Sequence, residues 1–251
     1  MSIEYTAAGG IARITLNRPD KRNAITSEMM SALRDALHRS SDDPAVRVLL
    51  IRGAGKDFCA GLDLSEVLKG AEDAQASLTS ARRLGDLYIA MRRHPKPIMA
   101  AVQGRALGGG AGIATASDLI IASESAQFGY PEVKLGFIPA IVATMLRRAV
   151  NERQAMELAL TGEPLNASRA HVLGLINRVN PDAEFATEVE RYAARLAEQP
   201  ATAMSLSKRL LYETDGMTFE ASIEAGVQAN VQVRTTDDFK RGVERFLKKS
   251  H

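Results

Sequence analysis

The feature that most constrains the fold is a run of glycines between an apolar strand and a helix. Pro97 to Val102 has the pattern of a buried β-strand, and five glycines follow within nine residues, at positions 104, 108, 109, 110 and 112. Glycine at this density lets the main chain approach another molecule closely. The stretch from Lys96 to Pro139 therefore predicts an active site that is built mainly from backbone.

Length and composition predict a single globular core with no nucleic-acid or membrane partner. The chain has 251 residues, 45% of them hydrophobic, which is enough for one large core or for a core with a helical appendage. A net charge of +2 does not indicate nucleic acid or an anionic membrane as a partner. The apolar stretch from Leu107 to Ala122 is interrupted by glycines and by Asp118, so we expect no membrane segment.

Cysteine and histidine usage predicts a cytoplasmic protein without a metal site. Cys59 is the only cysteine, and the chain does not open on a secretory leader pattern. The four histidines lack the spacing of zinc ligands, and they fall at positions 38, 94, 171 and 251. We expect no bound metal.

Strand and helix patterns alternate through the first 150 residues. Ile11 to Asn17 alternates apolar and polar residues, and Arg47 to Arg52 is a β-favouring apolar run. Between them, apolar residues from Met29 to Leu37 recur at helical spacing, after a cap at Thr26 or Ser27. This order predicts a β-α-β unit in a parallel, buried sheet.

Two further strands are expected, at Leu119 to Ala122 and at Ala126 to Phe128, after which the sheet is predicted to end. From Ile141 onward the pattern predicts helices only. Their expected ranges are 142–149, 152–160, 167–173, 184–198, 201–212, 219–233 and 239–248. The chain is thus divided into a core at 1–160 and a helical oligomerisation region at 161–251, in which residues Phe219, Ile223, Val227 and Phe246 form a subunit interface or, as the alternative, pack within their own subunit.

Two strand-to-helix turns bring chemistry to the predicted sheet. Asp57 to Leu64 follows the second strand, and within it we expect Asp63 to cap a helix and Leu62 to pack under it. Gly108 to Gly110 forms the second turn. Because the two turns leave parallel strands at the same sheet edge, they place two backbone donors where a developing oxyanion would lie.

Other glycine-rich loops fit this sequence less well. The cluster lacks the Lys-Ser/Thr of a P-loop and the spacing of a dinucleotide-binding turn. A third feature is Glu132, which follows Pro131 after the last predicted strand. A glutamate in a loop is usually only solvated, so this residue gains meaning from its combination with the two turns.

The order of motifs closely resembles the crotonase superfamily, that is, the enoyl-CoA hydratase and isomerase family. The motifs are FCAGLDL at 58–64, KPIMAAVQGRALGGG at 96–110 and SDLIIASESAQFGYPEVKLGFIP at 117–139. LNRP at 16–19, KRNA at 21–24, ALTGE at 159–163 and AHVLGLIN at 170–177 extend the resemblance over nearly the whole chain.

This resemblance implies an α/β fold, a crotonase-like spiral of β-β-α units, in trimers or dimers of trimers that act on acyl-CoA. Coenzyme A is then part of the substrate, and no separate cofactor is expected. The resemblance also implies that the thioester oxygen is held by the main-chain N–H groups of Leu62 and Gly109 and that Glu132 is the catalytic acid and base. Asp118 is expected to be structural. The CoA-binding residues implied are Lys21, Arg22, Ala24, Ala60, Leu62, Asp63 and Leu64, with Lys248 and Lys249 as rival contacts for the CoA phosphates.

One position departs from the hydratases of this family. They carry a glutamate where this chain has Gly112, so only one of two catalytic carboxylates remains. A single base still moves a proton between C2 and C4 of an enoyl chain, which favours an isomerase. Hydration stays open if a water held by main chain, or an acidic residue such as Asp63 or Glu66, supplies the missing function. The bulkier residues of Pro139 to Thr144 are expected to reshape the acyl pocket.

Two other functions are considered. A serine hydrolase needs a serine close to a histidine and an aspartate, yet the glycine turn contains no serine and the histidines lie outside the motifs. A non-catalytic protein that binds acyl-CoA is the stronger alternative, because Gly112 replaces a catalytic residue. Retention of Glu132 argues against it.

Overall fold

Two β-sheets form the centre of the protein, in a computed structural model that describes residues 1–249 apart from the side chain of Lys249. The larger sheet has the order β1-β2-β3-β4-β6-β9. Its strands are β1 (Ile3–Ala8), β2 (Ile11–Leu16), β3 (Val48–Gly53), β4 (Ile98–Val102), β6 (Leu119–Ser123) and β9 (Arg178–Asn180). The smaller sheet contains β5 (Arg105–Leu107), β7 (Gln127–Gly129) and β8 (Leu165–Asn166).

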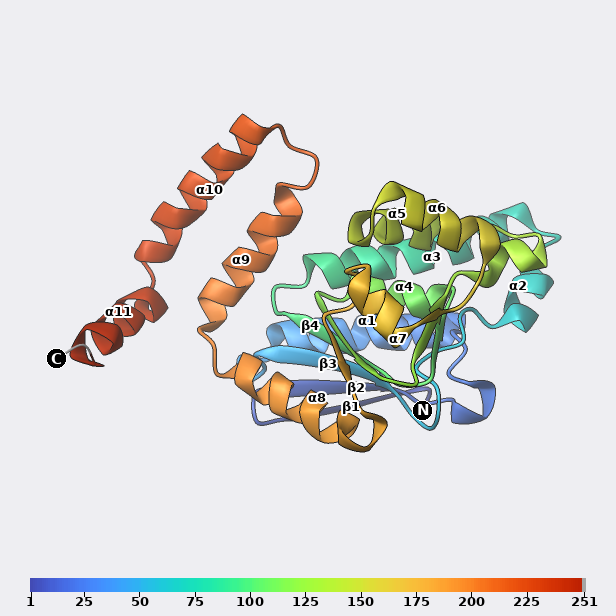
Figure 1. Ribbon diagram of the computed structural model, residues 1–251, viewed down its shortest axis with the longest axis horizontal. Helices are drawn as coiled ribbons and strands as arrows, with labels where there is room; N and C mark the ends of the chain where they lie inside the picture. Colours follow the sequence, from blue (N-terminus) through green and yellow to red (C-terminus); the bar gives the residue numbers. More distant parts are fainter. Residues whose placement is uncertain (250–251) are drawn as a thin grey trace.

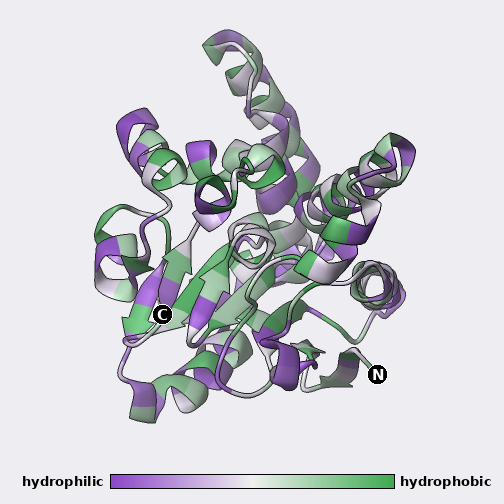
Figure 2. Ribbon diagram, turned by 90° about the vertical axis from the view of Figure 1, so that its right-hand side faces the viewer, coloured by the Kyte–Doolittle hydropathy of each residue, from purple (hydrophilic) through white to green (hydrophobic). Residues whose placement is uncertain are grey.

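The larger sheet is parallel except at its first pair. Strands β1 and β2 form an antiparallel hairpin, whereas β2, β3, β4, β6 and β9 run parallel. All five side chains of β4 are buried, which matches the near-continuous apolar sequences of strands covered on both faces. Figure 2 shows this as mainly hydrophobic strands at the centre, beneath helices that carry both hydrophobic and hydrophilic residues. The predicted parallel sheet is confirmed, with the first hairpin as an unpredicted addition.

Consecutive segments alternate between the two sheets. β4 of the larger sheet is followed by β5 of the smaller one and then by α4 (Gly109–Ala116). β6 is followed in the same way by β7 and by the 3-10 helix η2 (Pro131–Leu135). This repetition is the predicted spiral of β-β-α units. It brings the ends of β5 and β7 together, because these strands pair in parallel from Arg105 with Gln127 to Leu107 with Gly129.

The helices cover the sheets and then continue beyond them. A single 3-10 turn, η1 (Pro19–Lys21), follows β2. Of the two predicted caps for helix α1, the structure shows Thr26 as the N-cap and not Ser27. The other bounds are α1 (Ser27–Asp42), α2 (Leu64–Gly70), α3 (Ala74–Arg93), α5 (Ala140–Ala149), α6 (Glu152–Thr161), α7 (Ala167–Val172), α8 (Asp182–Ala197), α9 (Ala201–Glu213), α10 (Phe219–Arg234) and α11 (Asp237–Lys249).

The prediction that only helices follow residue 141 is wrong. Strand β8 pairs with β7, and β9 extends the larger sheet by pairing with β6. These strands contain two and three residues, which is too short for a period-2 pattern to be visible in the sequence. Their pairing is decided by neighbours that lie far away in the chain. Helix α8 also packs on this sheet, against β2, β3, β6 and β9.

Helices α9, α10 and α11, here called the C-terminal arm, extend to one side of the sheets (Figure 1). Within the described residues these helices pack mostly against one another. Phe219, Ile223 and Val227 are 76%, 55% and 49% exposed, so the alternative that they pack within their own subunit is wrong. A role of residues 161–251 in oligomerisation stays a prediction.

Candidate active site

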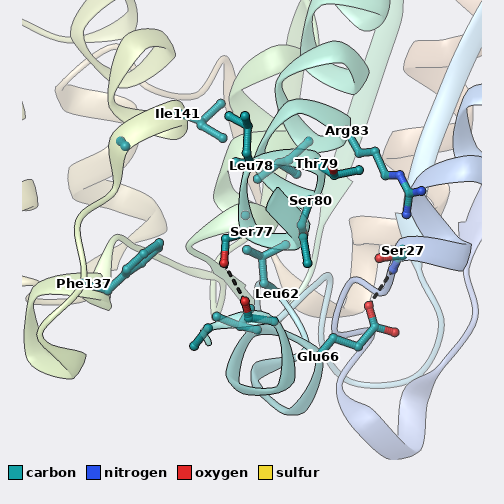
Figure 3. Close-up of a pocket in the computed structure, with 18 of the residues that line it drawn as sticks. Ser27, Leu62, Glu66, Ser77, Leu78, Thr79, Ser80, Arg83, Phe137 and Ile141 are labelled. Atoms are coloured by element: carbon teal, nitrogen blue, oxygen red, sulfur yellow. Dashed lines mark hydrogen bonds between the residues drawn. The ribbon is translucent and has the colours of Figure 1, made fainter. Parts of the chain in front are cut away.

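A cavity of about 1090 Å³ lies beside the turns at Leu62 and Gly109. Helices α2 and α3 form one wall, and Phe137 to Val142 form another (Figure 3). The wall side chains are mostly apolar, as in Val67, Leu78 and Ile141. The expected part of Pro139 to Thr144 in shaping a pocket is confirmed for residues 139–142, which line this cavity.

The two glycine-containing turns, Cys59–Leu62 and Gly108–Gly110, lie next to each other and are called the paired turns below. A parallel bridge joins Cys59 to Ala106: the N–H of Cys59 donates to Arg105 O at 2.9 Å, and the N–H of Leu107 donates to Cys59 O at 2.9 Å. A Cβ on Gly61 would lie 3.7 Å from Gly109 N. The bridge therefore holds the start of helix α4 against the first turn.

The amides of Leu62 and Gly109 are available as donors. Gly109 is the first residue of α4, where an N–H group has no partner inside the helix. Among the described residues, neither Leu62 N nor Gly109 N donates to a backbone oxygen outside regular secondary structure. The Leu62 side chain packs against the core, as expected. The structure thus brings together the two amides that were predicted from separate parts of the chain.

An ion pair joins the loop segment before the first turn to strand β5, which precedes the second turn. Asp57 accepts from the guanidinium of Arg105 at 2.8 and 2.9 Å and from the Arg105 N–H at 3.0 Å. The hydrogen bonds from the Arg105 side chain are the largest cause that lowers the pKa of Asp57, and burial opposes them. Asp57 is 8% exposed. Sequence reasoning did not identify this clamp.

Asn23 holds the Lys21–Ala24 segment against the first turn. Its side-chain amide donates to Ala54 O at 2.9 Å and to Asp57 O at 2.8 Å, and its Oδ1 accepts from the N–H of Arg18. The N–H of Ala60 donates to Arg22 O at 3.0 Å. Asn23 is fully buried and has a φ of 55°, a left-handed conformation that asparagine tolerates better than most residues. The sequence motif contained this residue, but not its role.

The predicted CoA-binding residues lie on two segments, Lys21–Ala24 and Ala60–Leu64, which are joined by the hydrogen bond from Ala60 N–H to Arg22 O. Of these residues, only Leu62 lines the cavity. Lys21, Arg22 and Leu64 are exposed, and Ala24 and Ala60 are partly buried. Lys248 is exposed at the end of α11, and the side chain of Lys249 lies outside the described part of the chain.

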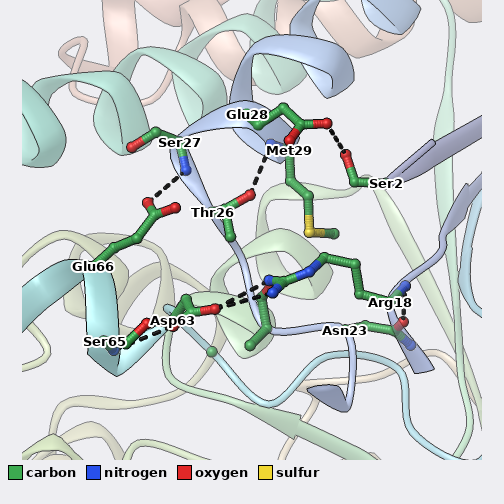
Figure 4. Close-up of polar contacts among 12 residues, drawn as sticks. Ser2, Arg18, Asn23, Thr26, Ser27, Glu28, Met29, Asp63, Ser65 and Glu66 are labelled. Atoms are coloured by element: carbon green, nitrogen blue, oxygen red, sulfur yellow. Dashed lines mark hydrogen bonds and ion pairs between the residues drawn. The ribbon is translucent and has the colours of Figure 1, made fainter. Parts of the chain in front are cut away.

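Asp63 is engaged in helix capping. It accepts from Ser65 N at 3.1 Å at the start of α2, as predicted, and from the guanidinium of Arg18 at 3.2 Å (Figure 4). The hydrogen bond from the Ser65 side chain is the first cause that lowers its pKa, and the Arg18 contact adds to this. A carboxylate held in this way is ionised and is not aimed at the cavity.

Three carboxylates line the cavity, and two of them are bound to main-chain amides. Glu66 accepts from Ser27 N at 2.9 Å at the start of α1 (Figures 3 and 4). Asp73 accepts from Gln75 N at 2.8 Å and from Ala76 N at 3.1 Å at the start of α3. Glu132 is the third. Its buried Oε2 has no hydrogen-bond partner within the described residues.

The Glu132 carboxyl group faces the second turn. A Cβ on Gly108 would lie 3.0 Å from Glu132 Oε1, so a larger residue here would push this carboxylate from its position. Gly108 has a φ of 49°, which also favours glycine. Burial raises the pKa of Glu132, and a hydrogen bond with its own backbone partly opposes the rise. The site therefore contains a carboxylate that gains and loses a proton closer to neutral pH than usual.

Asp118 is structural, as predicted from the sequence. It accepts from Ile98 N at 2.7 Å, from the hydroxyl group of Tyr212 at 2.7 Å and from Lys208 Nζ at 2.8 Å. Lys208 lies on α9, so this buried cluster attaches the C-terminal arm to the larger sheet at the N-terminal ends of β4 and β6. Asp118 does not line the cavity at the paired turns.

No helix in residues 1–249 combines the length and the apolar character that crossing a membrane requires. No group of three histidine, cysteine, aspartate or glutamate side chains in that range is arranged to hold a metal ion.

The fold and the cavity define a class: a spiral of β-β-α units in which two strand-to-helix turns and one desolvated carboxylate meet. Residues 6–251 match the enoyl-CoA hydratase/isomerase family, so the chain belongs to this family. Its activity is accordingly that of an acyl-CoA enzyme of the hydratase and isomerase type.

Individual relatives agree with this assignment. The chain is 39% identical to a Thermus thermophilus protein named "Putative enoyl-CoA hydratase", over 96% of each chain. It is 33% identical to the 1,2-epoxyphenylacetyl-CoA isomerase of Escherichia coli, with 96% of this chain and 93% of that protein covered. The crystal structure of human enoyl Coenzyme A hydratase domain-containing protein 3 superposes with a TM-score of 0.95 at 28% identity, covering 99% and 98% of the two chains. The α/β spiral predicted from the sequence is thereby confirmed.

Proposed function

We propose that the protein binds an enoyl-CoA thioester in the cavity beside the paired turns and uses Glu132 as its only catalytic acid and base. The observation that carries this proposal is the buried Oε2 of Glu132, which has no partner within residues 1–249 although it lies against the second turn. A desolvated carboxylate without a partner costs stability and is a mark of a functional site. The other two cavity carboxylates are bound to helix N-termini and are not free to react.

The amides of Leu62 and Gly109 are the proposed oxyanion donors. When Glu132 removes a proton from C2 of the acyl chain, negative charge moves to the thioester oxygen. Two N–H groups fixed by the Cys59–Ala106 bridge stabilise that charge without reorganising, and each such donor contributes about 3 kcal/mol in comparable sites. The raised pKa of Glu132 lets the same group return the proton.

Migration of the double bond is favoured over hydration. Hydration requires a second group that positions water at C3, and the position at which related hydratases carry it is Gly112 in this chain. The two acidic substitutes are both engaged: Asp63 by Arg18 and Ser65, and Glu66 by Ser27 N. Glu132 alone is sufficient to move a proton from C2 to C4.

Three further assignments belong to the same proposal. The CoA moiety lies along the Lys21–Ala24 and Ala60–Leu64 segments, with Lys21 or Arg22 near its phosphates, and it is carried by the substrate, with no separate cofactor. The C-terminal arm mediates assembly into a trimer or a dimer of trimers. These assignments are supported by the backbone contact between Arg22 and Ala60 and by the exposed apolar side chains of α10.

A paired assay tests the proposed function. Wild-type protein and Glu132→Gln are incubated with a 3-enoyl-CoA and with a 2-enoyl-CoA, and the conjugated enoyl-thioester absorbance is followed. We expect the wild type to convert the 3-enoyl substrate, and Glu132→Gln to lose about 10³-fold or more of kcat while acyl-CoA binding measured by calorimetry is retained. Glu152→Gln, an exposed residue at the start of α6, is the matched control.

Three other outcomes of this assay would each contradict a different part of the proposed function. Full turnover by Glu132→Gln contradicts the assignment of the base. Loss of absorbance from the 2-enoyl substrate, with formation of a 3-hydroxyacyl product, establishes a hydratase that works without the usual first glutamate. Tight binding of acyl-CoA without turnover of either substrate establishes the non-catalytic alternative.

A further inference from the structure

The space in front of Gly112 is occupied by a tyrosine. Tyr88 comes from α3, is 3% exposed and directs its hydroxyl group at the first turn of α4. A Cβ on Gly112 would lie 2.3 Å from Tyr88 Oη and 2.6 Å from Tyr88 Cζ. Val142 Cγ1, from α5, would lie 2.6 Å away on the same Cβ. No residue larger than glycine fits at this position while Tyr88 is present.

The same hydroxyl group is bonded to the oxyanion turn. Tyr88 Oη donates to Gly109 O at 2.8 Å, and Gly109 is the residue whose N–H is a proposed oxyanion donor. Its Oη is also 3.6 Å from where a Gly109 Cβ would be. Burial raises the pKa of Tyr88 well above its ordinary value, with smaller contributions from Cys59, Glu132 and Tyr130, so the phenol stays protonated and keeps donating.

We propose that Tyr88 is a specificity-determining positioning residue, which fills the space beside Gly112 and so keeps water and a second carboxylate away from C3 of the bound enoyl chain. This inference rests on the proposed function and deepens it. It explains why the chain lacks the second glutamate: the phenol takes its volume. It also assigns the Tyr88 hydroxyl group the task of fixing the Gly109 peptide.

Double-bond migration and hydration differ in whether they need a water molecule in the space beside Gly112. In double-bond migration the C2–H bond breaks, the proton passes to Glu132 and the electron pair enters a dienolate. The proton then returns to C4, so no water is consumed. In hydration a water oxygen bonds to C3 and a proton is added at C2, which requires a water beside C3. By filling this space, Tyr88 excludes the water that hydration needs, whereas migration does not need a water there.

Removal of the phenol is expected to admit that water. Tyr88→Ala opens a cavity and frees the carbonyl oxygen of Gly109, and a buried water needs both room and polar partners. We expect the rate of hydration relative to migration to rise at least roughly tenfold, the change that about 1.4 kcal/mol of barrier produces.

The experiment measures both products from each variant by chromatography of the acyl-CoA pool. Leu87→Ala is the matched control, because Leu87 is fully buried on the same helix but is not among the side chains nearest to a Gly112 Cβ. It shows the effect of a cavity elsewhere, and its product ratio is expected to equal that of the wild type. Tyr88→Phe keeps the ring and loses the hydroxyl group. We expect it to keep the product ratio while kcat for migration falls roughly fivefold at unchanged KM.

A second measurement tests the occupied space without using catalysis. Gly112→Ala is made alone and in the Tyr88→Ala background, and the melting temperature of each protein is compared. We expect Gly112→Ala to lower the melting temperature strongly in the wild type and less where Tyr88 is absent, because both contacts with Tyr88 are then removed and only the one with Val142 Cγ1 remains.

The outcomes separate this inference from the function on which it rests. An unchanged product ratio in Tyr88→Ala, or a wild type that hydrates as fast as it isomerises, overturns the role of Tyr88 while Glu132→Gln still tests the base. Equal effects of Gly112→Ala in both backgrounds overturn the steric argument. A wild type that acts on neither enoyl-CoA overturns the proposed function, and the inference with it.

Discussion

The paired turns and the C-terminal arm differ in the surroundings of their glycines and in the exposure of their apolar side chains. In the turns, a Cβ on Gly110 would lie 2.3 Å from Cys59 O, and the surrounding side chains are buried. In the arm, a Cβ on Gly226 or Gly242 would meet nothing within 4 Å, and large apolar side chains are exposed. The part of the chain whose backbone does the proposed chemistry is closely packed on its protein side, whereas the arm has an uncovered apolar face.

The attachment of the two regions to the core differs as well. The turns are joined to their neighbours by a β-bridge and by many main-chain hydrogen bonds. The arm is attached through a few polar side chains, with Lys208 donating to Met91 O and Lys96 O and pairing with Asp118. Arg92 stacks on Tyr212 with 3.9 Å between its guanidinium carbon and the ring centroid. A helix held by so few contacts depends strongly on each of them.

The largest effect is expected from Gly110→Ala. Its new Cβ would lie 2.3 Å from Cys59 O and 2.7 Å from Cys59 Cβ, and buried backbone cannot move aside cheaply. We expect a loss of at least about 3 kcal/mol in the free energy of unfolding, at the upper end of overpacking effects, or a failure to fold. Urea denaturation measures it.

Gly85→Ala in α3 is the control for Gly110→Ala, since its Cβ would meet nothing within 4 Å. Alanine in a helix interior is expected to raise the free energy of unfolding by about 0.5 to 1 kcal/mol. If Gly110→Ala were as well tolerated as Gly85→Ala, the paired turns would not be the tightly packed region that the comparison requires.

Lys208→Met is expected to have the next largest effect, on the arm. The Lys208 and Asp118 side chains are 6% and 15% exposed, so removal of the cation leaves a buried carboxylate without its charge partner. Breaking such a pair costs about 3 kcal/mol. Hydrogen exchange should show faster exchange in α9 than in the strands of the larger sheet.

The double variant Lys208→Met/Asp118→Asn sharpens this prediction, because it removes both charges and keeps a polar group for Tyr212 and Ile98. We expect it to recover part of the lost free energy of unfolding. Uniform destabilisation of the arm and the sheet by Lys208→Met would show that the arm is not attached independently.

Asp57→Asn tests the clamp between the paired turns, with an expected loss of about 2 kcal/mol at neutral pH, since Arg105 is partly solvated. The pKa of Asp57 is lowered in the folded protein, chiefly by Arg105. Its stabilising contribution is therefore complete above the ordinary carboxyl pKa of about 3.9 and is lost as the pH falls through the lower folded-state pKa. Urea denaturation at several pH values should show the difference between wild type and variant shrinking only in acid. A difference that does not depend on pH would mean that the charge is unimportant.

Glu132 should show the opposite sign. Burial raises its pKa in the folded protein, so the ionised side chain destabilises the fold above that pKa and is without effect below the unfolded-state pKa. Glu132→Gln is thus expected to stabilise the protein at neutral pH although it removes activity, and the gain should disappear in acid. Thermal denaturation across the same pH range measures it. A loss of stability at neutral pH would show that the carboxylate has partners in the folded state.

The two regions also differ in how well the sequence predicts them. The turns were predictable because their glycines, the Asp63 cap and the apolar strands are local sequence patterns. The family resemblance added the prediction that Glu132 lies in the same site. Tyr88 was missed, since α3 has no distinctive sequence pattern beside the motifs and its bond to Gly109 spans 21 positions.

Long-range contacts account for the other omissions. Lys208 reads as one more helical lysine until α9 is placed beside Asp118, a residue that precedes it by 90 positions. Strands β8 and β9 exist because β7 and β6 have free edges for them. A sequence pattern cannot report a partner that only the complete fold brings near, which is why the arm was predicted as helices without their attachment.

Gly226→Ala, in α10 of the arm, is expected to change the free energy of unfolding least, and it tests whether the exposed face of α10 is covered by another copy of the chain. In the described residues nothing lies within 4 Å of its new Cβ, so an isolated chain should gain about 0.5 to 1 kcal/mol in the free energy of unfolding from the better helix former. Gly85→Ala provides the reference for a gain of that size inside one chain. If a second copy of the chain packs closely on α10, the added methyl group meets that copy, and the variant instead loses stability and dissociates at a higher protein concentration. Sedimentation and urea denaturation of both variants therefore distinguish an arm that stays open from an arm that is covered in the assembled protein.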